Sequence, residues 1–416
     1  MKNIDIILPE RIPILREQPK QDLKVKDEEF SLYYKNFITP LYPWYDVVIE
    51  CEYGKNYGFC WRIKNYPESI SEFPLTVKVY DAEGTLVGEK SVVIELFDQS
   101  VTKPFKILCV GDSQTHHSIY VAHMQNRLYN VFTVGTRSFD GHVFFEGRGG
   151  WRYSQYFEKH TLNENERGAC KWVSPFLFPE GVNGRDYFGD MEFYEASQEK
   201  DRSTITFNGF VLEPIKDGQY YNKHGKLYRY PEKEPVSETV KWEFDFKKYL
   251  EKNNITGLNA VSVLLGANDL YPDRYEDVDS IVAEYIKNAK RFIAAVKAAD
   301  KNIDVIINLP ICASEQIGWA ERGGCSGSSK MYSYSIRKGA KALIDEFENT
   351  DGVYICPTMC SFDAENNYPV TTMRVNLYND RLIERKDDNV HPSPDGYRQM
   401  GDTLSAMVEK LRHKKN

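Results

Sequence analysis

Hydrophobic and polar positions alternate in the first hundred residues of the chain, over runs short enough to be single strands. The clearest runs cover residues 45–53, 58–63, 75–80 and 85–96. Alternation with a period of two is typical of strands that bury one face. A short turn at residues 81–84 joins the last two runs. The pattern therefore predicts a small all-β sandwich at the N-terminus.

The pattern changes at about residue 105. Strand-sized apolar runs now alternate with segments whose apolar residues recur every three or four positions. The apolar runs are residues 106–110, 131–134, 260–265, 305–309 and 353–355, and the helical patterns are residues 281–299, 332–347 and 394–411. Strands that alternate with helices predict an α/β domain, with a parallel sheet covered on both faces. In such folds ligands bind at the carboxyl ends of the strands, so a functional site is expected there.

Residues 168–243 interrupt this alternation. They are rich in aromatic residues, Gly and Pro, and they show only weak periodicity. Because a structureless loop of this length is unusual in a compact domain, we expect an insertion with β structure of its own. We also expect it to help build the substrate side of the site. The 416 residues are thus expected to divide into a β domain, 1–103, and an α/β domain, 104–416, that carries the insertion.

Composition narrows the classes of partner. The chain is 41% hydrophobic and 27% charged, an ordinary globular balance that argues against disorder. A net charge of −8 argues against nucleic-acid binding. No apolar run approaches the ~18 residues of a membrane span, and the first residues lack the apolar core of a signal peptide. We therefore expect no membrane association and a cytoplasmic protein, or a secreted or periplasmic one if a signal was removed.

The aromatic residues and the cysteines each bear on the kind of ligand expected. The chain holds 28 Tyr, 22 Phe and 6 Trp, and such aromatic side chains suit surfaces that bind amphipathic ligands such as sugars. Its eight Cys are scattered and do not form the pattern of a disulfide framework. Cys356 and Cys360 lie four positions apart, which does not fit a usual zinc pair. We expect no metal and no cofactor.

Three short motifs place reactive or polar groups where the predicted strands end. Ser113 follows the first strand of the α/β pattern, in a turn where its Oγ is placed to attack a ligand in the crevice. Gly149 and Gly150 form a pair whose backbone N–H groups can approach a ligand closely. Asn268 follows the third strand, and its amide can donate toward the same crevice. Each motif alone also fits a helix cap or a plain turn.

The fourth motif is His391, just before the last predicted helix. Histidine is the residue type best suited to act as a general base near pH 7. Asp388, three residues earlier, can hydrogen-bond the ring and fix its tautomer, and Asp387 is its rival for that role.

Taken together, in this order, the four motifs resemble those of the SGNH (GDSL-type) hydrolase family. The matching blocks are residues 111–113, 149–151, 266–269 and 388–391, and the resemblance covers roughly residues 105–411. The β domain and residues 147–151 look most like the two-domain carbohydrate acetylesterases of that family. The resemblance implies a three-layer α/β/α, flavodoxin-like domain.

The resemblance also implies a role for each motif. Ser113 is the nucleophile, His391 the general base and Asp388 the residue that orients His391. The oxyanion hole consists of the backbone N–H groups of Ser113 and Gly150 together with the side-chain amide of Asn268. Gly149 replaces Gly150 if the block is shifted by one position.

The function expected from this reading is a serine esterase that removes O-acetyl groups from a carbohydrate. Its substrate is then a small-molecule or oligosaccharide ester, and the oligomeric state stays open. Arg148, Trp151, Trp172 and Tyr271 are the residues expected to contact this substrate, the aromatic ones by stacking on sugar rings. An acyltransferase or a lipase/thioesterase on the same scaffold is one alternative. A non-catalytic glycan-binding protein is another.

Overall fold

The protein is described from a computed structural model. The structure describes residues 4–16, 29–64, 66–67, 69–158, 160–161, 171–172, 174–179, 205–207, 210–214, 219–221, 227–229, 242–321 and 327–414. Most of the expected insertion at 168–243 therefore lies outside the described residues.

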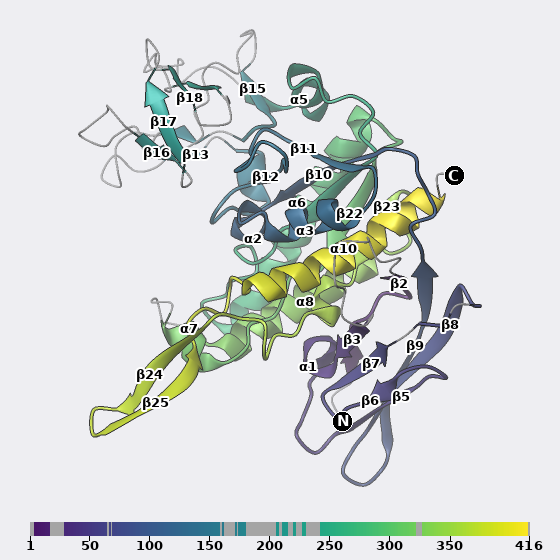
Figure 1. The fold of residues 1–416 in the computed structure, drawn as a ribbon. Coiled ribbons are helices and arrows are strands. Elements are labelled where there is room, and N and C mark those ends of the chain that lie inside the picture. The colour runs from purple at the N-terminus through teal and green to yellow at the C-terminus, as the bar shows by residue number, and fades with distance from the viewer. Residues whose placement is uncertain are drawn as a thin grey trace.

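The N-terminal region consists mainly of β-strands, as the alternating pattern predicts (Figure 1). Its larger sheet has the order β2-β9-β8-β5, formed by Arg11–Leu15, Leu86–Phe97, Glu72–Tyr80 and Asp46–Glu50. Its smaller sheet has the order β3-β7-β6, formed by Glu29–Tyr33, Cys60–Lys64 and Lys55–Asn56. β1 (Asp5–Ile6) pairs with β4 (Ile38–Thr39), and the four-residue helix α1 (Tyr34–Phe37) lies between β3 and β4. The predicted all-β region is confirmed.

A parallel sheet forms the centre of the second region, as predicted. Its order is β11-β10-β21-β22-β23, formed by Val131–Val134, Phe105–Gly111, Ala260–Leu264, Asp304–Asn308 and Val353–Cys356. A further short strand, β12 (Glu146–Gly147), pairs in parallel with the end of β10. Every residue of β21 and β22 is buried, since helices cover both faces of the sheet.

Helices lie on both faces of this sheet, which gives the three-layer α/β/α arrangement. On one face, α6 (Val278–Ala299) and α8 (Ser329–Phe347) share an apolar cluster with Leu108 and Val110 of β10. On the other face, α3 (Ile119–Arg127) and α10 (Pro394–Lys414) share a cluster with Ile107 and Cys109. The alternation along β10 thus sends successive side chains into opposite layers. The remaining short helices are α2 (Ser113–His116), η1 (Ser154–Tyr156), α5 (Phe246–Lys252), η2 (Tyr275–Asp277), α7 (Gln316–Glu321) and α9 (Thr358–Ser361).

One feature that the sequence patterns did not predict is a hairpin between α9 and the last helix. β24 (Val370–Asn376) and β25 (Asn379–Lys386) form an antiparallel ribbon that projects from the molecule (Figure 1). Most of its residues are exposed, and β25 ends two residues before Asp388.

The described parts of the 168–243 segment are short antiparallel strands. They comprise β14 (Lys171–Trp172), which pairs with β13 (His160–Thr161), β15 (Leu177–Pro179), which pairs with β20 (Trp242–Phe244), and the meander β16 (Ile205–Phe207), β17 (Phe210–Pro214), β18 (Gln219–Tyr221) and β19 (Leu227–Arg229). The expectation that this segment has β structure of its own is met where it is described. Whether it forms the substrate side of the site depends on residues outside that part and stays a prediction.

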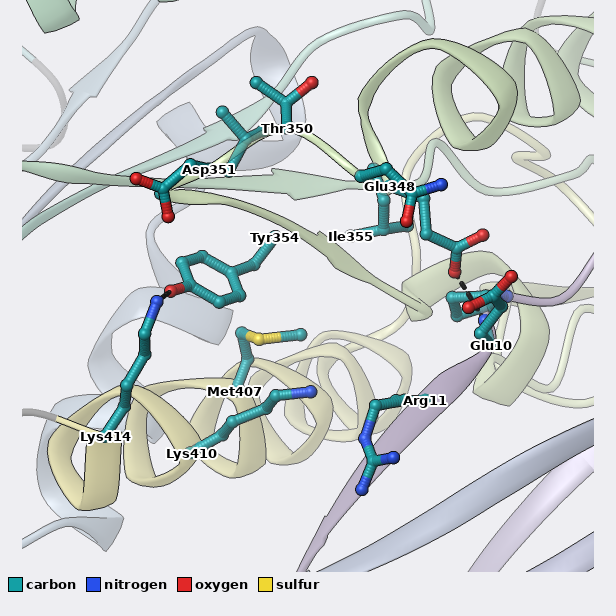
Figure 2. Close-up of a pocket in the computed structure, with 14 residues that line it drawn as sticks. Glu10, Arg11, Glu348, Thr350, Asp351, Tyr354, Ile355, Met407, Lys410 and Lys414 are labelled. Carbon is teal, nitrogen blue, oxygen red and sulfur yellow. Dashed lines mark hydrogen bonds between the residues drawn. The ribbon is translucent and has the colours of Figure 1, made fainter.

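The two regions meet along an extensive seam. One apolar cluster contains buried side chains from both, so the division at residues 103 and 104 also stays a prediction. A cavity of about 440 Å³ lies in this seam, where β2 meets α10 and the loop before β23 (Figure 2). On its rim, Arg11 and Lys410 both pair with Glu95 at 2.6 Å, and Lys414 bonds the hydroxyl of Tyr354. The Lys410–Glu95 pair joins the two regions. Among the described residues, no helix is long and apolar enough to span a membrane.

Candidate active site

Ser113 stands at the first position of α2, directly beyond the carboxyl end of β10. Asp112 caps this one-turn helix, because its Oδ1 accepts a hydrogen bond from the backbone N–H of Gln114 at 2.9 Å. Gly111 precedes it where a side chain has no room: an added Cβ would collide with the hydroxyl of Thr115 and the carbonyl of Leu264. The turn that carries Ser113 is therefore held tightly between neighbouring elements.

His391 lies within hydrogen-bond distance of Ser113, although 278 positions separate them in the sequence. The distance from Nε2 of His391 to Oγ of Ser113 is 2.8 Å, and Nδ1 of His391 lies 3.0 Å from Oδ2 of Asp388. With Nδ1 donating to the carboxylate, Nε2 accepts from the serine hydroxyl. The structure thus brings the Ser, His and Asp of two distant motifs into one chain of hydrogen bonds.

Asp388 is held as a carboxylate. Burial acts to raise its pKa, but the hydrogen bonds from the His391 ring and from the backbone N–H groups of His391 and Val390 outweigh it and lower the pKa to about 2. The side chain of Asp388, rather than that of its rival Asp387, bonds the imidazole.

The loop that carries His391 is anchored from two sides. Gln114, the residue after Ser113, donates from Nε2 to the backbone carbonyl of Val390 at 2.8 Å. Asn389 is fully buried and accepts from the hydroxyl of Ser314 at 2.6 Å. Sequence reasoning missed both anchors. Their positions beside Ser113 and between Asp388 and His391 are the signal that would have pointed to them.

The glycine pair forms a tight turn beside the serine. The backbone N–H of Trp151 donates to the carbonyl of Arg148 at 3.2 Å, and Gly150 at the third position has φ 75°, as a type II turn requires. At the start of the turn, the N–H of Arg148 donates to the carbonyl of Gly111 at 2.8 Å. The turn is therefore hydrogen-bonded to the end of β10, the strand that leads to Ser113.

Three hydrogen-bond donors belong to the segments around Ser113 and the glycine turn. Within the described part of the chain, the backbone N–H groups of Ser113 and Gly150 have no hydrogen-bond partner. The amide of Asn268 donates one of its two hydrogens to the carbonyl of Trp151 at 3.1 Å, which leaves the second hydrogen for a ligand. These are the three donors that the sequence motifs singled out.

Two buried carboxyl groups are sequence neighbours of these donors: Asp112 precedes Ser113, and Asp269 follows Asn268. Asp269 accepts from the backbone N–H of Tyr153 at 2.9 Å, and burial raises its pKa to about 7. Burial also raises the pKa of Asp112 to about 7, and the nearby carboxyl of Asp269 adds to the effect. The neutral form of each group is therefore favoured far above the ordinary range of a carboxylic acid.

The residues expected to contact a substrate differ in their exposure and in their contacts. Trp151 is only 3% exposed and packs edge-on against Tyr156, so the structure argues against its stacking on a sugar. The Arg148 guanidinium is engaged by Glu146, with Nη2 2.8 Å from Oε2. Tyr271 is 38% exposed and stacks on Trp319 with centroids 5.2 Å apart, so it presents an aromatic surface. Trp172 lies in β14, and its side chain is outside the description.

No cluster of three or more His, Cys, Asp or Glu side chains suited to a metal ion occurs among the described residues. The thiols of Cys356 and Cys360 are both free and buried, and burial raises the pKa of each well above its ordinary value.

A hydroxyl, an imidazole and a carboxylate in hydrogen-bonded series, at the carboxyl edge of a parallel sheet, form the arrangement that serine hydrolases use. Residues 222–404 match the family model of the GDSL-like lipase/acylhydrolases. This part of the chain is therefore similar to the GDSL-type (SGNH) hydrolases. The matched span includes Asn268, Asp388 and His391 and begins after Ser113 and Gly150.

Comparison with curated proteins gave no match. Among solved structures, the chain is similar to a carbohydrate esterase of family 3 from Talaromyces cellulolyticus, at 13% identity and a TM-score of 0.36, covering 74% of this chain and 99% of that one. A carbohydrate acetylesterase family member from Sinorhizobium meliloti is 14% identical with a TM-score of 0.37, over 74% and 99%. A family 3 carbohydrate esterase from Clostridium thermocellum is 14% identical with a TM-score of 0.35, over 76% and 100%. Similarities at this level of identity and TM-score do not identify a substrate for this chain.

Proposed function

We propose that the protein is a serine esterase that forms an acyl-enzyme on Ser113. The observation that carries the proposal is the pair of contacts on the imidazole of His391, 2.8 Å to Oγ of Ser113 and 3.0 Å to Asp388. A neutral hydroxyl is a weak nucleophile, and an adjacent base that removes its proton during attack activates it.

The reaction follows from these positions. Oγ of Ser113 attacks the ester carbonyl while its proton moves to Nε2 of His391, and the carboxylate of Asp388 stabilises the imidazolium that results. The carbonyl oxygen becomes an oxyanion in the tetrahedral intermediate. His391 then returns the proton to the departing alcohol, and the acyl group stays on Ser113. A water molecule activated by His391 attacks the acyl-enzyme, and the acid leaves as Ser113 regains its proton.

The oxyanion is stabilised by the N–H groups of Ser113 and Gly150 and by the free amide hydrogen of Asn268. These donors are fixed before substrate binds, since Asn268 bonds Trp151 and the 148–151 turn bonds the end of β10. Pre-oriented donors stabilise developing charge without reorganisation, and removal of one such donor typically slows an enzyme by ~10²–10³.

For the substrate, we propose an O-acetylated carbohydrate. Residues 147–151 resemble those of carbohydrate acetylesterases, and the exposed ring of Tyr271 stacked on Trp319 offers a platform of the kind that sugar rings pack against. Trp151 is withdrawn as a direct sugar contact because it is buried, whereas a contact by Arg148, whose guanidinium binds Glu146, stays a prediction.

The test is hydrolysis of p-nitrophenyl esters from acetate to laurate, together with acetate release from acetylated xylan and acetylated xylo-oligosaccharides. Wild type should cleave the acetyl ester best and release acetate from the glycan, and Ser113→Ala should do neither. A rate maximum at long acyl chains would replace the carbohydrate substrate with a lipid or thioester. Binding of the glycan with no turnover by wild type would refute the esterase altogether.

A further inference from the structure

Glu146 is a buried carboxylate that belongs to none of the four sequence motifs. It lies on β12, with 0% of its surface exposed, and its backbone pairs with Val110 at the end of β10. Transfer of an ionised carboxylate from water into a protein interior costs several kcal/mol unless charged and hydrogen-bonding partners offset it. Burial of Glu146 beside the turn that carries Ser113 therefore needs partners that offset this cost.

The carboxylate of Glu146 is held by partners from three segments. Oε1 accepts from the backbone N–H of Thr136 at 2.7 Å and from the hydroxyl of Tyr249 at 2.6 Å. Oε2 accepts from Nη2 of Arg148 at 2.8 Å. Oε1 is thus tied to the scaffold, and Oε2 binds Arg148 of the glycine turn.

Arg148 is the residue through which this carboxylate reaches the turn. Its guanidinium is bound by Glu146, its N–H donates to Gly111, and its carbonyl accepts from Trp151. The two residues that follow it, Gly149 and Gly150, have no side chains of their own to restrain them, and glycine has the largest backbone freedom of any residue. Their position therefore depends on what holds the two ends of the turn.

The other end of the turn is also fixed. The carbonyl of Trp151 accepts from the amide of Asn268 at 3.1 Å. The first end of the turn is thus held by the Arg148 N–H on Gly111 and by the Glu146–Arg148 ion pair, and the second end is held by Asn268.

We propose that Glu146 is a positioning residue for the esterase reaction: through Arg148 it holds the N–H of Gly150 in place as an oxyanion donor. This proposal rests on the proposed function. Glu146 itself touches no reacting atom, so its effect falls on stabilisation of the transition state and leaves binding of the ground-state ester nearly unchanged.

The first test is Glu146→Gln, which keeps the size of the side chain and an amide oxygen for Thr136 and Tyr249 but turns an amide N–H₂ toward Arg148. We expect kcat on p-nitrophenyl acetate to fall by ~10²–10³, the loss of one oxyanion donor, with little change in KM. Glu158→Gln removes an exposed carboxylate from the same segment and serves as the matched control, with kcat unchanged.

Affinity for a boronic acid gives a second readout that a merely structural role would not move. A boronate adds to Ser113 as a tetrahedral anion that occupies the oxyanion hole, so its inhibition constant should rise in Glu146→Gln by a factor similar to the loss in kcat. If Glu146→Gln fails to fold, Arg148→Met removes the same ion pair from its less buried partner, and the same losses are expected.

A double-mutant cycle isolates the contact. If both residues act through the one ion pair, the double variant Glu146→Gln/Arg148→Met should be no slower than either single variant, whereas independent roles would multiply the losses. An active wild type with Glu146→Gln and Arg148→Met near its kcat and boronate affinity would overturn the positioning role and leave the esterase standing. A wild type with no turnover and no boronate affinity would overturn both.

Discussion

The packing of Gly147 against the nucleophile helix makes a prediction about activity that does not involve any catalytic group. Gly147 is the second residue of β12, and its backbone lies directly against α2. A Cβ added there would stand 2.5 Å from the carbonyl carbon of Thr115 and 2.7 Å from Cα of His116. Both atoms are backbone, so no side-chain rotation relieves the contact.

The size of the displacement follows from these distances. An ordinary contact begins at 3.4 Å, so Gly147→Ala requires β12 and α2 to separate by at least 3.4 − 2.5 = 0.9 Å, and the backbone N of His116 would stand closer still. Ser113 begins that helix, and a misplacement of ~1 Å at a reacting group can cost ~10² in rate. Overpacking of this kind also destabilises a fold by about 1–3 kcal/mol.

Gly149→Ala is the matched control. It lies two residues away, an added Cβ there meets nothing within 4 Å, and the substitution keeps the backbone N–H. We expect kcat/KM for p-nitrophenyl acetate to fall ~10²-fold in Gly147→Ala and to stay near the wild-type value in Gly149→Ala. Urea denaturation of both variants separates a local shift from unfolding.

Two results would refute this reasoning. Full activity in Gly147→Ala would mean that β12 yields without moving Ser113. An equal loss in Gly149→Ala would mean that the glycine turn, rather than the contact with α2, is the sensitive element.

Three further outcomes are expected. Ser113→Ala and His391→Gln should each lower kcat by ~10⁴–10⁶ in the ester assay, and a smaller loss would mean that another base or nucleophile operates. Asn268→Ala should lower kcat by ~10²–10³ with little change in KM, measured on the same ester, because one oxyanion donor is lost. Asp269 has a pKa of about 7 in the folded protein, above its ordinary value of 3.8. Between these two pH values, folding is therefore accompanied by uptake of a proton. The free energy of unfolding should fall as pH rises through this window. The slope is ~1.4 kcal/mol per pH unit for this group, and Asp269→Asn should flatten the dependence in urea titrations between pH 5 and 7; an unchanged slope would contradict the assignment.

The strands and helices of this protein were largely predictable because their signals are local. The five parallel strands appear where apolar runs were found, and α6, α8 and α10 follow the predicted helical stripes. The hairpin of β24 and β25 was missed, since its exposed strands lack the buried alternation on which strand prediction depends.

In the candidate site, too, some features were predictable from the sequence and others were not. Ser113, Asn268, Asp388 and His391 could be singled out because each has a chemically distinctive side chain beside the end of a predicted element. Trp151 was expected to face a substrate but is buried, because the exposure of an aromatic ring depends on which distant segments pack around it. The 168–243 insertion, expected beside the site, lies mainly outside the described residues.

By itself, the sequence determined the alternation of strands and helices and the residue types that carry the chemistry, because both depend on near neighbours along the chain. Only the tertiary structure showed that Gln114 anchors the loop of His391 and that Tyr249 binds the carboxylate of Glu146. Both contacts join segments more than a hundred positions apart, which the fold brings together. Such contacts leave no period or motif in the chain, so they are found only when the fold places the partners within hydrogen-bond distance.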